Sequence, residues 1–138
     1  MFVLLLRDGS HKEIHAPCLL DAMREALRWG ADLRIDGGSP RIMQSDEIRQ
    51  ALSLDRPGLF DAYHPEWSPP SADEFRELLK VAQLTGSQAG LLVGVPSGKI
   101  RKWAGGDSSP PYAVWRLLTV YAGLAKADIF HSNDEITD

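Results

Sequence analysis

The sequence predicts an α+β fold, in which a small N-terminal unit of strands and helices precedes an all-helical unit. Three observations support this prediction. About the first fifty residues contain short apolar runs separated by turn residues, a pattern typical of paired strands. Proline and aromatic residues are concentrated at residues 55–70. From there to residue 124, apolar residues recur with the helical period of about 3.6 residues.

The N-terminal unit, residues 1–54, is expected to hold two strand pairs and two helices. Turn signals at residues 7–10 and 36–39 separate the two members of each strand pair. Gly30 ends the first helix, because glycine readily takes the left-handed conformation of a helix end. The expected elements are strands at residues 2–6 and 11–15, a helix at 17–29, strands at 33–35 and 41–43, and a helix at 45–52.

The segment at residues 55–70 is the candidate linker between the two units, since its four prolines interrupt regular structure. Phe60, Tyr63 and Trp67 make it too apolar for a solvated tether. We therefore expect this linker to pack against one of the units or against a second subunit.

The helical unit, residues 71–124, begins with a complete helix-start signal. Ser71 and Glu74 have the spacing of a capping box, in which each side chain bonds the other residue's backbone N–H. The expected helices run from residue 71 to 84, from 86 to 93, from 96 to 104, and onward from Pro110 and Pro111. The inward face of the last helix is assigned to Val114, Leu117, Leu118 and Tyr121.

The second and third of these helices have the spacing of a helix-turn-helix. Gly94 suits the sharp turn, which needs positive φ, and Val95 follows it as an apolar plug. Gly90 is small enough for two helix backbones to meet there. On the next helix Ile100 and Trp103 share one face, which predicts a buried edge. The cations of that helix point elsewhere: Lys99, Arg101 and Lys102.

Residues 71–124 resemble the DNA-binding domain of the lambda repressor and Cro type, the broad XRE-like family. The resemblance rests on Leu84-Thr85 before the second helix, the turn Leu92-Val93-Gly94-Val95, the buried Ile100 and Trp103, Gly106 after the third helix and Pro110 before the fourth. It implies a cytoplasmic, sequence-specific transcriptional regulator, most simply a dimeric repressor that reads a palindromic operator in double-stranded DNA.

The resemblance also implies roles for individual residues. Ser87 or Gln88, at the start of the second helix, would contact a phosphate. The third helix would enter the major groove, with Arg101 or Lys102 reading a base and Lys99 on a phosphate. Ser97 has two open roles, capping the third helix or reading a base. The candidate DNA-binding residues are Ser87, Gln88, Ser97, Gly98, Lys99, Arg101 and Lys102.

The formal net charge of −4 is unevenly distributed. Residues 1–70 and the acidic tail at 125–138 each carry −3, whereas residues 71–124 carry +2. Because salt screens charges beyond about 8 Å, the local sign decides which partner this unit attracts. The modest excess leaves open an alternative: a protein-interaction module or inhibitor, of phage, plasmid or toxin–antitoxin type, that keeps the fold without DNA binding as its main role.

Other functions find little support in the sequence. No nucleophile with a neighbouring base is evident, so we expect no enzyme and no cofactor. Cys18 and four scattered histidines make a poor metal set, and Cys18 is expected to be a buried, inert thiol. No apolar run is long enough for a membrane helix or a signal peptide. The N-terminal unit is expected to mediate dimerisation or sensing, including binding of a protein partner.

Overall fold

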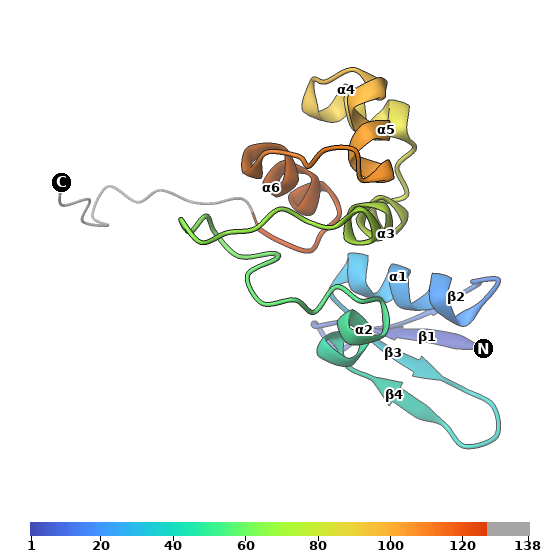
Figure 1. Cartoon of the computed structure of the whole chain (residues 1–138). Coiled ribbons are helices and arrows are strands. Elements are labelled where there is room, and N and C mark those ends of the chain that lie inside the picture. Colours follow the sequence, from blue (N-terminus) through green and yellow to red (C-terminus); the bar gives the residue numbers. More distant parts are fainter. Residues whose placement is uncertain (127–138) are drawn as a thin grey trace.

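The computed structural model describes residues 1–126, and the acidic tail predicted from residue 125 therefore lies almost wholly outside the described residues. The predicted α+β fold is confirmed. The described residues form one four-stranded antiparallel sheet and six helices. Figure 1 shows the sheet at one end of the molecule, with helices stacked above it.

The sheet has the strand order β2-β1-β3-β4. Its strands are β1 (Phe2–Leu5), β2 (His11–Ile14), β3 (Asp32–Ile35) and β4 (Arg41–Met43), as the turn signals predict to within one or two residues. Leu4 pairs with Leu33, which pairs in turn with Met43. These three side chains are buried on one face of the sheet, because side chains directly opposite each other in a ladder point the same way.

Helix α1 (Leu19–Trp29) packs against β3 of the sheet, and α2 (Ser45–Ala51) packs beside α1 (Figure 1). The apolar stripe of α1 is fully buried and consists of Ala22, Met23, Ala26 and Leu27. Helix α1 ends at Gly30, which takes the left-handed conformation at φ 64° and donates its N–H to the preceding turn. It begins two residues later than the sequence predicts.

The helical unit comprises α3 (Ala72–Ala82), α4 (Gly86–Val93), α5 (Ser97–Gly105) and α6 (Tyr112–Tyr121). Its core is formed around three aromatic rings. Phe75 meets Trp103 edge-on at 6.0 Å between ring centroids and lies 6.3 Å from Trp115. The predicted capping box at the start of α3 is confirmed, since the Ser71 Oγ accepts from the Glu74 N–H and Glu74 accepts from the Ser71 N–H.

The predicted inward face of α6 is correct for Leu118 and for the partly buried Val114, but wrong for Leu117 and Tyr121. Leu117 is 40% exposed and Tyr121 48% exposed, whereas Trp115, Leu118, Thr119 and Ala122 are fully buried. The hydroxyl of Thr119 bonds the Arg116 carbonyl within the same helix, so this polar side chain is satisfied without water. Trp115 is the largest fully buried side chain and sets the orientation of the helix.

The sheet unit is attached to the helical unit through α1, which lies between the sheet and α3 (Figure 1). Arg24 of α1 forms a two-pronged ion pair with Glu77 of α3, at 2.6 and 3.1 Å. Arg28 donates to the Val81 carbonyl at 2.8 Å. Gly123, after α6, lies so close to Arg28 that an added Cβ would come within 2.4 Å of its carbonyl oxygen. One continuous apolar core therefore joins the sheet to the four C-terminal helices.

Candidate nucleic-acid interface

The turn between α4 and α5 has the geometry that its sequence predicts. Gly94 ends α4 with φ at 75°, a conformation that glycine adopts without steric penalty. The next residue, Val95, donates its N–H to the Gly90 carbonyl at 3.0 Å and packs against the core. A Cβ at Gly90 would lie 2.6 Å from the Val95 carbonyl oxygen. Gly90 is therefore required for α4 and α5 to cross this closely.

A second capping box, which the sequence analysis did not identify, begins α4. Thr85 Oγ1 accepts from the Gln88 N–H at 3.1 Å, and Gln88 Oε1 accepts from the Thr85 N–H at 2.9 Å. The pattern of a threonine followed three residues later by glutamine is the signal that identifies it. This capping fixes the Gln88 side chain across the start of α4, while the neighbouring Ser87 is exposed.

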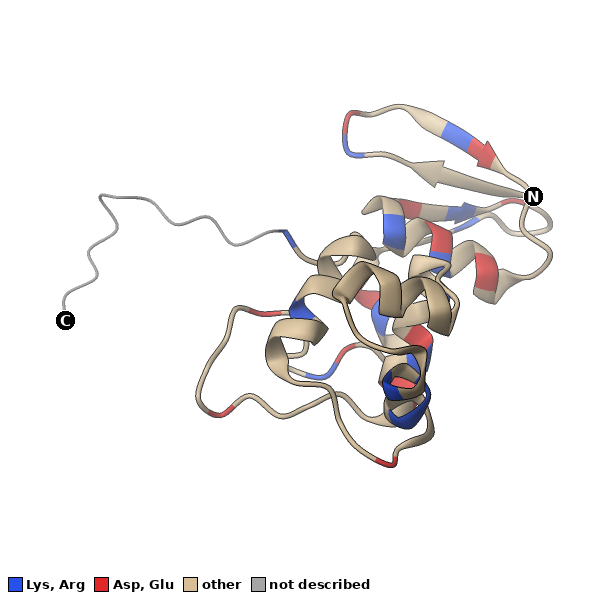
Figure 2. Ribbon diagram, turned by 90° about the horizontal axis from the view of Figure 1, so that it is seen from above, with Lys and Arg blue, Asp and Glu red and all other residues tan. Residues whose placement is uncertain are grey.

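Helix α5 has a buried edge and a cationic edge, as predicted. Ile100 is 1% exposed and Trp103 5% exposed, and both pack beneath the helix. The side chains of Lys99, Arg101 and Lys102 are exposed, and none forms an ion pair with a carboxylate of the described residues. Helix α4 carries no charged residue, so every charge on these two helices is positive (Figure 2).

Ser97 does not cap α5. The N-cap of this helix is Pro96, without a side-chain hydrogen bond, and Ser97 is the first helical residue. A serine caps a helix only from the position before the first helical residue, where its side chain meets the free N–H groups. Capping is therefore excluded for Ser97, and Ser97 and Gly98 lie in the first turn of α5, half-buried.

Helix α3 supports α5 from below. The guanidinium of Arg76 contacts both the Asp73 carboxylate and the Ala104 carbonyl at the end of α5. Its charge neutralises the negative end of the α5 dipole and satisfies a carbonyl that has no partner within the helix. Gly106 then ends α5 in the left-handed conformation.

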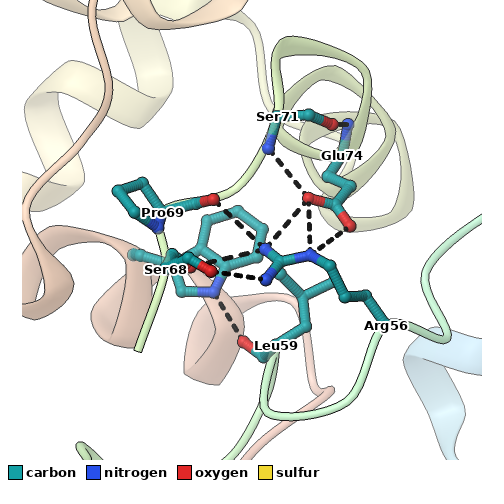
Figure 3. A network of polar contacts seen from close by, with 7 residues as sticks. Arg56, Leu59, Ser68, Pro69, Ser71 and Glu74 are labelled. Atoms are coloured by element: carbon teal, nitrogen blue, oxygen red, sulfur yellow. Dashed lines mark hydrogen bonds and ion pairs between the residues drawn. The ribbon is translucent and has the colours of Figure 1, made fainter. Parts of the chain in front are cut away.

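The linker at residues 55–70 holds the first turn of α3 in place (Figure 3). The Arg56 guanidinium donates to both carboxylate oxygens of Glu74, at 3.0 and 3.1 Å, and to the carbonyls of Ser68 and Pro69. Burial raises the pKa of Glu74, but hydrogen bonds from Arg56 and from the Ser71 N–H outweigh it, so that the net pKa lies below its ordinary value.

The linker also packs against α6, as its aromatic residues predict. Trp115 Nε1 donates to the Leu59 carbonyl at 2.7 Å, and the Phe60 ring stacks on Trp115. Trp67 and Tyr63 both meet the Tyr112 ring edge-on. The linker is therefore packed against the helical unit and is not a solvated tether.

Comparison with known proteins identifies relatives of this chain. Two proteins of Escherichia coli, both named transcriptional repressor protein KorC, are 49% and 41% identical to the chain over 61 residues. In each case the match covers 42% of this chain and 72% of the relative. The chain belongs to the KorC family. No family model and no solved structure matches it, so its resemblance to the lambda repressor and Cro family stays a prediction.

The KorC-family chain has no group of three or more potential metal ligands among residues 1–126. His11 and His15 are exposed. The expectation that Cys18 is buried is wrong, since its thiol is exposed and lies 3.4 Å from an Asp21 carboxylate oxygen. None of the helices in the described part is long and apolar enough to cross a membrane.

Proposed function

We propose that this KorC-family protein is a transcriptional repressor that binds double-stranded DNA sequence-specifically through α5. The observation that carries the proposal is the exposed set Lys99, Arg101 and Lys102, held outward by the buried Ile100 and Trp103 on a helix whose crossing with α4 is fixed. The names of the two relatives give independent support for a repressor.

The surface of α5 suits a DNA groove in shape and charge. A helix fits the major groove of B-DNA, and residues at the start of the helix meet the base edges. Phosphates attract cations from either side of the groove, and Lys99 suits this role because ammonium groups bind phosphate as point charges. The overall charge of −4 does not oppose this docking, since salt screens the distant acidic residues.

The start of α4 supplies a second point of contact. Its first N–H groups and the exposed Ser87 hydroxyl form a polar, uncharged surface that suits a phosphate. In the capping box Oε1 of Gln88 accepts the Thr85 N–H, and the amide N–H₂ of Gln88 is the group that can donate to a phosphate. In the proposed complex Ser87 and Gln88 set the position of the helix pair, and α5 supplies the sequence reading.

Two copies of the chain are required in this proposal. One short recognition helix makes too few base contacts for strong specificity, so that paired copies would bind half-sites about one helical turn apart. This is the arrangement of the lambda repressor and Cro family, to which we assign the helical unit.

Selection of bound duplexes from a random pool tests the proposal. We expect enrichment of a palindrome whose half-site centres lie about 10 bp apart, and sedimentation of the complex as two chains per duplex. If no sequence is enriched over the starting pool, at either low or physiological salt, sequence-specific binding is contradicted.

A further inference from the structure

The side chains of α5 leave its outermost line bare. Successive residues of a helix are rotated by about 100°, which places Gly98 roughly opposite the midpoint between the buried Ile100 and Trp103. Arg101 and Lys102 then lie about 50° to either side of this outermost line. Gly98, at this outermost line, therefore contributes no side chain of its own, and it is half-buried between the flanking cations Arg101 and Lys102.

The fold does not require glycine at position 98. Gly90 and Gly94 are explained by close backbone contact and by positive φ. Gly98, in contrast, has an ordinary helical φ, and outside the backbone of its own helix the contact that an added Cβ would make among the described residues is with Nη2 of Arg101, at 3.6 Å. This is a normal van der Waals distance to the end of a flexible side chain. Glycine within a helix nevertheless lowers its stability relative to alanine.

The same distance locates the Arg101 guanidinium. Arg101 extends back toward the start of α5, because long side chains on a helix point toward its N-terminus. Its guanidinium lies over Gly98, in the turn that comes first into a groove in the proposed complex. The following residue, Lys102, lies on the other side of the bare line.

We infer that Gly98 and Arg101 form the base-reading element of this protein and that the base read is guanine. Absence of a side chain at Gly98 lets the helix backbone approach the base edges. A guanidinium at that level donates two parallel hydrogen bonds to O6 and N7 of guanine, which an ammonium group cannot reproduce. Lys102, by contrast, contacts phosphate. The inference rests on the proposed function and names its specificity-determining residues.

Four variants of the full chain test this inference on the selected duplex and on an unrelated duplex. Gly98→Ala is expected to raise the melting temperature by about 2–4 °C. It should nevertheless weaken binding to the selected duplex about tenfold or more, because the methyl group meets the bases. Gly105→Ala is the matched control: an added Cβ there meets nothing within 4 Å among the described residues, and this glycine lies at the far end of α5. Its affinity for either duplex should remain within about twofold of wild type.

The remaining two variants separate the roles of the cations. Arg101→Lys keeps the charge, so we expect unchanged affinity for the unrelated duplex. Affinity for the selected duplex should fall about tenfold, and this loss should occur only where the duplex has guanine at one particular position. Lys102→Ala should weaken binding to both duplexes by a similar factor.

Three results would overturn the inference while leaving DNA binding intact: equal effects of the two glycine substitutions, retained guanine preference in Arg101→Lys, or loss of that preference in Lys102→Ala. A wild-type protein that binds both duplexes equally would instead overturn the proposed function itself.

Discussion

Gly90 on α4 lies directly against Val95, with 2.6 Å separating the position of a missing Cβ from the Val95 carbonyl oxygen. That carbonyl belongs to the turn, so it cannot move without displacing the start of α5. We expect Gly90→Ala to lower the free energy of unfolding by about 2–3 kcal/mol, as measured by urea denaturation, because the added methyl group forces the two helices apart.

Gly86→Ala is the control for this prediction. It is on the same helix, and its added Cβ would meet Ile100 Cγ2 at 3.7 Å, an ordinary contact. Its unfolding free energy should equal or exceed that of wild type by up to about 1 kcal/mol, since alanine favours a helix. Equal destabilisation by the two substitutions would show that the close crossing at Gly90 is not a special contact.

Two adjacent leucines test the orientation of α6. Leu118 is fully buried, whereas Leu117 is 40% exposed. Leu118→Ala should lower the free energy of unfolding by about 2–5 kcal/mol through loss of buried area and formation of a cavity. Leu117→Ala should change it by less than about 1 kcal/mol. Similar losses in the two variants would instead match the inward face predicted from the sequence, which contains both leucines.

The ion pair between Arg56 and Glu74 should make stability depend on acidic pH. The pKa of Glu74 is lowered in the folded protein, so the charged carboxylate stabilises the fold above its ordinary pKa of about 4.5, and this stabilisation is lost as pH falls further. Glu74→Gln keeps the capping box but removes the charge. We expect a loss of about 1–3 kcal/mol at pH 7 that becomes smaller toward pH 3, in urea unfolding at each pH.

Asp73→Asn provides the comparison, because Asp73 is in the same turn but its side chain is 88% exposed. Its effect should stay below about 1 kcal/mol at every pH. A Glu74→Gln deficit that is the same at pH 3 and pH 7 would rule out the proposed charge effect.

The hydrogen bond from Trp115 to the Leu59 carbonyl should control access of proteases to the linker. Trp115→Phe removes this donor and leaves a gap, which should lower the unfolding free energy by about 2–3 kcal/mol. Limited proteolysis, followed by mass spectrometry of the fragments, should show faster cleavage within residues 55–70. Trp29→Phe, at an exposed tryptophan, should leave the cleavage rate unchanged. Equal rates in both variants would mean that this bond does not hold the linker.

The sequence was sufficient to predict features that depend on neighbouring residues. The hairpin turns, the Ser71 capping box and the Gly94 turn follow from local backbone chemistry, and each is present. Gly90 was also predictable, because few residues fit where two helix backbones touch. The same reasoning placed Ile100 and Trp103 beneath α5 and its cations outside.

Features that depend on distant residues were not predictable in this way. The inward face of α6 was predicted only in part. Trp115 is held by Phe60 and Leu59 of the linker, and the apolar periodicity within one helix carries no information about these distant contacts. The docking of Arg24 on Glu77 joins residues far apart in the chain, and an arginine on a helix surface gives no sign of its partner. Cys18 is exposed because α1 begins immediately after it, at the edge of the core.

If the cationic edge of α5 binds DNA, the affinity for the selected duplex should depend strongly on salt concentration. We expect the logarithm of affinity to fall steeply with the logarithm of salt concentration for wild type. Arg101→Ala with Lys102→Ala should reduce both affinity and slope, while Lys12→Ala with Arg41→Ala, which removes two cations from the sheet, should change neither. A folded Arg101→Ala, Lys102→Ala protein with wild-type affinity and slope would show that this edge of α5 does not bind DNA.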